Sequence, residues 1–263
     1  MSTPDVPLRL ELTYELPGTA EQVWDAIATS GGIGSWFIPT DVEERRGGTI
    51  VVYMGDEQSP GTVTGWDPPR RFAYEEPDWA GLMGQEGAVV TPLATEFLVE
   101  ARSGGTCVVR VVSSAFGVGA DWERQAFESM EKGWAPFFEH LRLYLSHFAG
   151  QRATLLSVAA DMPGAPEEAV TAMRYALGIE QNGQRIVVRG LGGQVDRISG
   201  DHLLLRLTDP MPGYLAFYAY DTGKGGSGAE VRGYLFSPDA EEYVKREQPA
   251  WKAWLTSLAV RAS

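Results

Sequence analysis

The side chains of this chain that could bind a metal are few and widely spaced. It holds three histidines and a single cysteine, namely His140, His147, His202 and Cys107. His140 and His147 would share one face of a helix, but no cysteine or carboxylate lies at a spacing that completes a zinc site. We therefore expect no metal. A single cysteine also excludes an internal disulfide and is typical of a protein in a reducing cytoplasm.

Gly223–Gly228 is the segment that most invites interpretation as a phosphate-binding loop. Its sequence, GKGGSG, lacks the Gly-x-x-x-x-Gly-Lys-Ser spacing, and a strand rather than a helix is predicted after it. We interpret it as a flexible hairpin loop, and we expect neither a dinucleotide site nor any other cofactor. A Ser-His-Asp triad has no supporting motif, because the sequence contains no Gly-x-Ser-x-Gly nucleophile elbow.

Pairs of acidic residues are the remaining candidates for acid–base chemistry. They occupy positions where strand ends or helix starts would be solvated, so we interpret them as solvated rather than as general acid–base pairs. Arg70-Arg71 could face an anionic group of a ligand, but pairing of an arginine with Glu75 or Glu76 is the favoured interpretation. The acidic pairs are Glu43-Glu44, Glu75-Glu76 and Glu241-Glu242.

Pro17–Phe37 is the most informative segment for the fold that would position such groups. It combines a turn, an amphipathic helix at Ala20–Thr29 and a second helical turn that ends at Trp36-Phe37. Directly before it, the alternating residues of Leu8–Glu15 predict a half-buried strand. A long strand, two short helices and then a run of strands is the start of a helix-grip fold, which encloses a cavity.

The rest of the first half predicts further strands and one long helix. Apolar residues recur at helical spacing from Asp121 to Phe148, where Pro136 should kink the helix or mark a break near Gly133. Pro77–Pro92 is rich in glycine and proline and predicts a surface loop. The strands are expected at Gly48–Tyr53, Gly61–Trp66, Arg71–Glu75, Thr95–Ala101 and Thr106–Ser113.

The second half of the chain repeats this order in shorter form. Trp251–Leu258 parallels Trp134–Leu141, and Gln184–Val188 echoes Gly48–Val52. Matches in a shared order predict two tandem domains, 1–150 and 151–263. The second is expected to contain strands at Thr154–Ala160, Arg185–Arg189, Gln194–Ile198, His202–Leu207, Tyr214–Tyr220 and Glu230–Phe236, and helices at Pro166–Leu177 and Ala240–Val260.

Composition limits the classes of partner. The chain has 263 residues, 44% of them hydrophobic and 22% charged, which is typical of a globular protein. Its net charge is −13, and residues 1–150 hold 10 Lys/Arg against 22 Asp/Glu. This acidic half argues against binding to nucleic acid or to an anionic membrane surface. The sequence shows no signal peptide and no apolar run that could cross a bilayer, so a cytoplasmic protein is expected.

Seven short motifs follow one another in the first half of the chain. They are Glu21–Ile27, Trp36-Phe37, Gly47-Gly48, Gly61–Val63, Asp67–Tyr74, Gly104–Thr106 and Gly133-Trp134. No single one is diagnostic, but in this order they resemble the SRPBCC (START-like) superfamily, in the branch similar to the activator of the heat-shock-protein-90 ATPase. The resemblance covers residues 8–148, and the second half looks like a degenerate copy without the Trp-Phe pair.

The resemblance implies an α+β helix-grip domain, in which a curved antiparallel sheet wraps around the long C-terminal helix and leaves an apolar tunnel. Large side chains must reach into this space, where aromatic residues provide wide apolar walls. Each of them alone could equally be core filler. The candidate cavity residues are Trp36, Phe37, Tyr53, Trp66, Tyr74, Phe97, Phe116, Trp122, Phe127, Met130, Trp134 and Phe138.

Three functions follow from this resemblance. The first is non-enzymatic binding of a small hydrophobic or polycyclic molecule in domain one. The second is an enzyme similar to polyketide cyclases or hydratases, which needs no recognisable motif. The third is a co-chaperone-like module that binds a protein partner, or a homodimer. If the cavity binds a ligand, Trp36→Ala and Trp134→Ala should impair binding more than folding, and domain two would stabilise domain one or mediate pairing.

Overall fold

The chain consists of two compact units, which we call domain one (Met1–Arg152) and domain two (Ala153–Ser263). The computed structural model describes residues 3–55, 57–222 and 225–261, so part of the predicted hairpin loop at Gly223–Gly228 lies outside the described residues. The boundary between the units lies two residues after the expected one. Each unit is an antiparallel sheet with a long C-terminal helix, which confirms the α+β helix-grip class in two copies.

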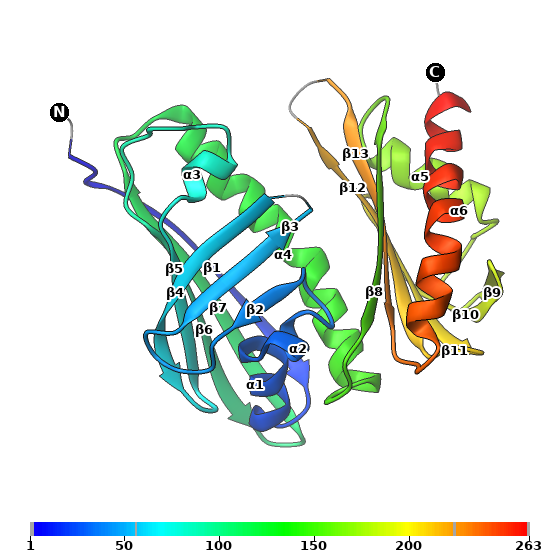
Figure 1. Cartoon of the computed structure of the whole chain (residues 1–263), viewed down its shortest axis with the longest axis horizontal. Helices are drawn as coiled ribbons and strands as arrows, with labels where there is room; N and C mark the ends of the chain where they lie inside the picture. Colours follow the sequence, from blue (N-terminus) through cyan, green and yellow to red (C-terminus); the bar gives the residue numbers. More distant parts are fainter. Residues whose placement is uncertain (1–2, 56, 223–224, 262–263) are drawn as a thin grey trace. The chain divides into compact units, whose positions relative to one another are not determined.

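Domain one is a seven-stranded antiparallel sheet with the order β1-β7-β6-β5-β4-β3-β2. The long helix α4 runs along one face of the sheet, with α1 and α2 at one end and α3 at the other (Figure 1). The strands are β1 (Val6–Pro17), β2 (Thr40–Val42), β3 (Thr49–Met54), β4 (Glu57–Asp67), β5 (Arg71–Glu76), β6 (Leu93–Arg102) and β7 (Thr106–Gly117), and the helices are α1 (Ala20–Ala28), α2 (Ser30–Ile33), α3 (Trp79–Leu82) and α4 (Asp121–His147).

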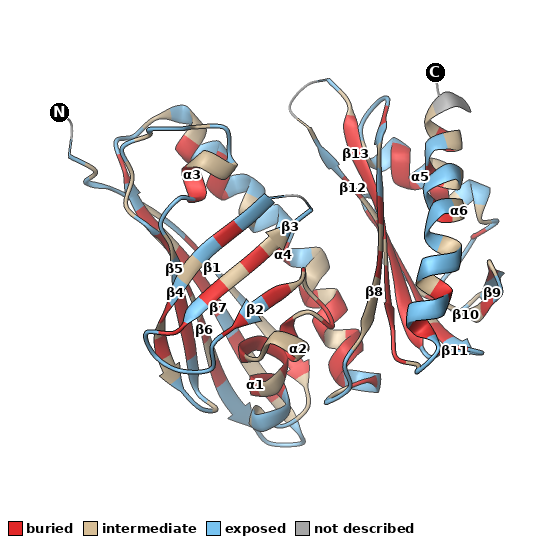
Figure 2. Cartoon of the chain, in the orientation of Figure 1, coloured by how far each residue is buried: buried red, intermediate tan, exposed pale blue. Residues whose placement is uncertain are grey.

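Buried and more exposed residues alternate along strands such as β6, because successive side chains of a strand point to opposite faces of the sheet (Figure 2). In β6, Leu93, Thr95, Phe97 and Val99 are buried, and the residues between them are more exposed. This period carries the inward-facing residues of β5, β6 and β7 to the face that α4 covers.

Helix α4 is continuous from Asp121 to His147 and passes through Pro136 without a break. The expected break near Gly133 is therefore absent. Its start is fixed by Glu123, whose carboxylate accepts hydrogen bonds from the backbone N–H groups of Val118, Gly119 and Ala120. These bonds fix the backbone that leads into the helix, since Ala120 is the N-cap residue and Val118 and Gly119 precede it.

The stretch Pro77–Pro92 is not simply a surface loop, and that prediction was wrong. It contains α3, whose Trp79 is 2% exposed and donates a hydrogen bond from Nε1 to the Thr91 carbonyl at 3.0 Å. The high glycine and proline content concealed a single large apolar anchor. The segment therefore contributes a buried tryptophan to the hydrophobic core of domain one.

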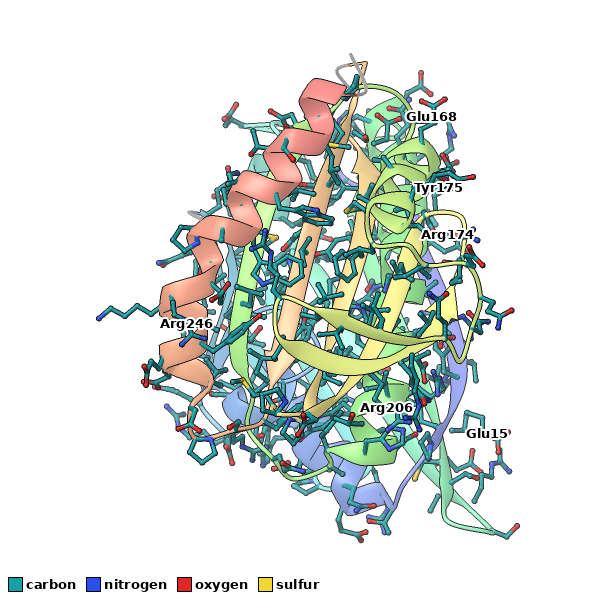
Figure 3. The ribbon with its side chains drawn as sticks, turned by 90° about the vertical axis from the view of Figure 1, so that its right-hand side faces the viewer. Glu15, Glu168, Arg174, Tyr175, Arg206 and Arg246 are labelled. Carbon is teal, nitrogen blue, oxygen red and sulfur yellow. The ribbon has the colours of Figure 1, made fainter. Side chains whose placement is uncertain are left out.

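Domain two has a six-stranded sheet with the order β8-β13-β12-β11-β10-β9. Helices α5 and α6 lie over one face of it (Figure 3), where Phe217, Trp251 and Leu255 belong to the core. Tyr175 on α5 is 78% exposed and points away from that core. The elements are β8 (Thr154–Met162), α5 (Pro166–Ala176), β9 (Arg185–Val188), β10 (Leu191–Ile198), β11 (His202–Asp209), β12 (Gly213–Asp221), β13 (Ser227–Leu235) and α6 (Ala240–Arg261).

Candidate ligand pocket of domain one

A row of three hydroxyl groups crosses the sheet of domain one beneath α4. Tyr74 on β5 pairs with Thr95 on β6, and Thr95 pairs with Ser113 on β7, so the three residues are direct cross-strand neighbours. Thr95 Oγ1 and Ser113 Oγ are 3.3 Å apart, and Tyr74 hydrogen-bonds to Thr95. Burial, assisted by the nearby charge of Glu76, raises the pKa of the Tyr74 phenol far above its usual range, so the hydroxyl keeps its proton.

Aromatic rings from the α2–β2 connection and from α4 stand over this row. Phe37 and Trp134 are stacked with their centroids 5.3 Å apart, and Phe137 meets Phe37 edge-on at 4.6 Å. The backbone N–H of Phe37 donates to the Ile33 carbonyl at 2.9 Å, which fixes the turn that presents the ring. These rings form one wall of the space below α4.

The opposite wall comes from α3. Trp79 lies there with Leu82 and Met83, and its indole packs against two α4 residues, Trp122 at 5.6 Å and Phe127 at 5.9 Å between centroids. The start of α4 therefore holds α3 in place. This wall of the cavity therefore depends on both α3 and α4.

Between these walls lies a cavity of about 260 Å³. Three methionines, Met54, Met83 and Met130, lie among the less buried of its lining residues, and unbranched thioether side chains adapt readily to different shapes. The lining consists of Phe37, Ile38, Val52, Met54, Glu57, Tyr74, Glu76, Trp79, Leu82, Met83, Leu93, Thr95, Ser113, Met130, Gly133, Trp134 and Phe137.

Glu76 is the acidic group that the cavity holds most deeply. Phe72, Tyr74 and Glu76 occupy alternate positions of β5, so the alternation that buries the two aromatic residues also carries Glu76 to the inner face. Burial raises the pKa of its carboxyl group, against the opposing effect of a hydrogen bond with Ser59. The interpretation of Glu75-Glu76 as a solvated pair was therefore wrong for Glu76.

Arg71 faces the other side of the sheet. Its Nε lies 2.5 Å from Glu96 Oε1, so the expected pairing with Glu75 or Glu76 was wrong. Arg71 and Glu96 are both on the outer face, one residue out of phase with the cavity side chains. The guanidinium group is therefore directed away from the cavity.

The comparison with known families rests on the same half of the chain. Residues 17–146 match the family model described as "Activator of Hsp90 ATPase homolog 1-like protein". Over this range, domain one is similar to that family. The match spans the cavity elements from α1 through α4, and it leaves domain two unmatched. No curated protein sequence matches the chain.

Solved structures similar to this chain are distant in sequence. A protein from Mesorhizobium loti, MLL2253, is 19% identical, with 53% of this chain and 97% of that chain covered and a TM-score of 0.45. The di-domain ARO/CYC BexL from the BE-7585A biosynthetic pathway is 12% identical, with 96% and 97% covered and a TM-score of 0.45. The Aha1 dimer from Colwellia psychrerythraea is 16% identical, with 52% and 96% covered and a TM-score of 0.41.

Of the twelve cavity candidates in domain one, four line the cavity: Phe37, Tyr74, Met130 and Trp134. Trp36 does not, because it is fully buried and its Nε1–H donates to the Ala26 carbonyl at 2.8 Å, behind Phe37. Phe97 and Phe138 also lie outside the lining and pack beneath Trp134 as core.

The other five candidates occupy other parts of domain one. The Tyr53 hydroxyl donates to Asp41 at 2.7 Å at the surface, and Phe116 is 49% exposed at the end of β7. Trp66 packs edge-on against Trp24 of α1 at 5.0 Å. The last two, Trp122 and Phe127, support Trp79 from behind, as described above.

Sequence reasoning missed Trp79, Glu76, Thr95 and Ser113, which all line the cavity. Glu76, Thr95 and Ser113 lie at inward positions of their strands. Glu76 is in phase with Phe72 on β5 and Thr95 with Phe97 on β6, so the alternation along these strands was a usable signal. Trp79 had none, because it lies in a stretch without periodicity.

Two classes of site find no support. Within residues 3–55, 57–222 and 225–261, no group of three or more His, Cys, Asp or Glu is arranged to hold a metal ion. In the same described part of the chain, no helix combines the length and apolar character that a bilayer span requires.

Proposed function

We propose that domain one binds a small, largely apolar molecule of about two or three fused rings in the cavity between its sheet and α4. The observation that carries this proposal is the cavity itself, with a volume of about 260 Å³ and walls of stacked aromatic rings. An apolar cavity of about 150 Å³ suffices for benzene, so this one has room for a larger ring system.

The lining accounts for both affinity and orientation. Burial of apolar surface contributes about 25 cal/mol per Å², and the rings of Phe37, Trp79 and Trp134 offer wide faces for it. The hydroxyl row of Tyr74, Thr95 and Ser113 lies at the sheet side, where it can hydrogen-bond to one polar edge of a ligand. A few convergent polar groups in a mainly apolar pocket are typical of small-molecule sites.

A second candidate function is proton-transfer catalysis on the same class of molecule. Glu76 favours it, because burial raises the pKa of its carboxyl group, and such a group can give and take a proton in a mainly apolar cavity. The protonated Tyr74 hydroxyl lies in the same lining and would stabilise an oxyanion. Turnover of the bound molecule, lost in Glu76→Gln with binding retained, would select this candidate over simple binding.

The binding proposal is tested with 1-aminoanthracene, a neutral three-ring probe whose fluorescence rises in apolar surroundings. The informative variant is Gly133→Leu, since Gly133 lines the cavity and a Cβ there meets no heavy atom within 4 Å. Its side chain should fill the space without distorting α4 and weaken binding about tenfold.

The matched control is Ala135→Leu, which adds an exposed leucine to the same helix outside the lining. This variant should bind 1-aminoanthracene within about twofold of the parent protein. Equal affinities for both variants, or no saturable binding by the parent, would contradict the proposal. The second result would leave binding of a protein partner or of a second copy as the remaining interpretation.

A further inference from the structure

The ionisable groups of the cavity are all acidic. Glu57 on β4 and Glu76 on β5 belong to the lining together with the Tyr74 phenol. Among the described residues that form this lining, there is no lysine, arginine or histidine. Any charged group that enters therefore meets carboxyl groups and no positive side chain of the wall.

The basic residues of the sheet are directed elsewhere. Arg71 pairs with Glu96 on the outer face, and Arg110 pairs with Glu11 at 3.1 Å. Residues 1–150 as a whole carry 22 Asp/Glu against 10 Lys/Arg. The ionisable groups in and around the cavity therefore favour a cation over an anion, and low-dielectric walls make this preference more effective than it would be at an open surface.

The aromatic walls favour the same sign of charge. Phe37, Trp79 and Trp134 belong to the lining, and the faces of aromatic rings attract cations through their quadrupoles, tryptophan most strongly. An anionic ligand would have to enter against two carboxyl groups and these ring faces. A cation would gain from both.

We propose that the cavity selects a flat aromatic ligand that carries a positively charged nitrogen, with that charge held beside Glu76 and against the aromatic walls. The inference rests on the proposed function and adds the charge of the ligand to it. Such a ligand supplies the counter-charge that the partly buried Glu76 carboxyl group does not find among the described lining residues, while the hydroxyl row and the methionines accommodate the ring system.

The test uses three probes of nearly equal shape, each measured by displacement of 1-aminoanthracene. 10-Methylacridinium is permanently cationic, 9-methylanthracene is its neutral counterpart, and anthracene-9-carboxylate is the anion. At neutral pH the cation should bind about fivefold to tenfold more tightly than the neutral probe, and the anion should bind most weakly.

Two variants assign the selectivity to the cavity carboxyl group. Glu76→Gln keeps the shape and removes the charge, so the cation should lose most of its advantage while 9-methylanthracene binds as before. Glu75→Gln is the matched control, because Glu75 is the exposed neighbour on the other face of β5. This control should leave the order and spacing of the three affinities unchanged.

The outcomes separate the two proposals. If all three probes bind with similar affinity, or the neutral probe binds most tightly, the inference about charge fails and the proposed function stands. If Glu75→Gln reduces the cation's advantage as much as Glu76→Gln does, the assignment to the cavity fails. If neither 1-aminoanthracene nor any of the three probes binds, the proposed function fails and the inference fails with it.

Discussion

The rings of Phe37 and Trp134 stack with their centroids 5.3 Å apart and their planes 7° from parallel. One residue follows the short helix α2 and the other lies on α4, so this stack joins two segments almost a hundred residues apart in the sequence. Trp134 also meets Phe97 of the sheet edge-on at 5.8 Å. The contact thus closes one side of the cavity and anchors it to the sheet.

Replacing the two tryptophans near this stack should separate binding from folding. Trp134→Leu removes a cavity wall but keeps an apolar, helix-compatible side chain, so we expect about a tenfold loss of 1-aminoanthracene affinity. Trp36→Ala should instead cost about 3–5 kcal/mol of unfolding free energy, since it empties a fully buried site. Urea unfolding followed by probe titration measures both.

One result would contradict the different roles given to Trp36 and Trp134. If Trp36→Ala stays stable and loses the probe while Trp134→Leu binds normally, the cavity wall has been assigned to the wrong tryptophan. Trp36→Phe serves as the control for packing, because it keeps most of the ring volume and loses only the Nε1 hydrogen bond to Ala26.

The hydroxyl row should behave as a coupled unit. Thr95→Val and Ser113→Ala each leave a buried neighbour with fewer partners, and each should cost about 1 kcal/mol. The double variant should cost less than the sum, because it removes the donor and the acceptor of the 3.3 Å contact together. It should also bind 9-methylanthracene several-fold more tightly, as the sheet side of the cavity becomes apolar.

Chemical unfolding and displacement titrations test this coupling. Ser114→Ala is the control, because Ser114 is the neighbour of Ser113 on the opposite face of β7. Strictly additive costs, or an equal gain in affinity from Ser114→Ala, would show that the row does not act as a unit.

The architecture of domain one was predictable because its signals are periodic. The alternation in Leu8–Glu15 and the helical spacing after Asp121 correspond to β1 and α4. The cavity was only partly predictable. A list of aromatic residues cannot say which rings line a space and which fill the core behind it, as Trp36 and Phe37 show as immediate neighbours in the chain.

Glu76 and Trp79 illustrate two different limits of predicting the cavity from the sequence. Glu76 could have been found, since its phase on β5 matches Phe72 and Tyr74, but residue type was given more weight than phase. Trp79 could not, because its burial depends on rings of α4 that lie more than forty residues away in the sequence. Tertiary packing decides such positions, and no local pattern encodes it.

The pH dependence of stability should report on Glu76. Its pKa in the folded protein is raised above the ordinary 4.5, mainly by burial. The folded protein therefore holds a proton that the unfolded chain has released, so this group lowers stability as pH rises from about 4.5 through its folded pKa. Glu76→Gln removes this loss, and its advantage over the parent protein should grow as pH increases.

Denaturant unfolding at several pH values between 4 and 8 measures this difference. Glu57 and Tyr74 are the other titratable groups of the lining, and both remain in the variant. Glu75→Gln, on the exposed face of the same strand, is the matched control for the loss of a carboxyl group. An advantage of Glu76→Gln that shrinks with rising pH would contradict a raised pKa.

The final prediction concerns the start of α4, where the Glu123 carboxylate is 1% exposed and accepts three backbone hydrogen bonds of 2.9–3.1 Å. Glu123→Ala leaves these donors without their acceptor and should cost about 2–4 kcal/mol. Glu128→Ala, which breaks only an exposed pair with Arg124, should cost less than about 0.5 kcal/mol.

Glu123→Ala should also change the cavity, because the first turn of α4 packs against α3. Fraying of the first turn of α4 releases Trp122, whose ring lies 5.6 Å from that of Trp79, so α3 loses its support and one cavity wall loosens. We therefore expect Glu123→Ala to weaken 1-aminoanthracene binding severalfold at temperatures where the domain is still folded, whereas Glu128→Ala leaves it unchanged. Unaltered binding in a destabilised Glu123→Ala protein would mean that α3 holds its position without α4.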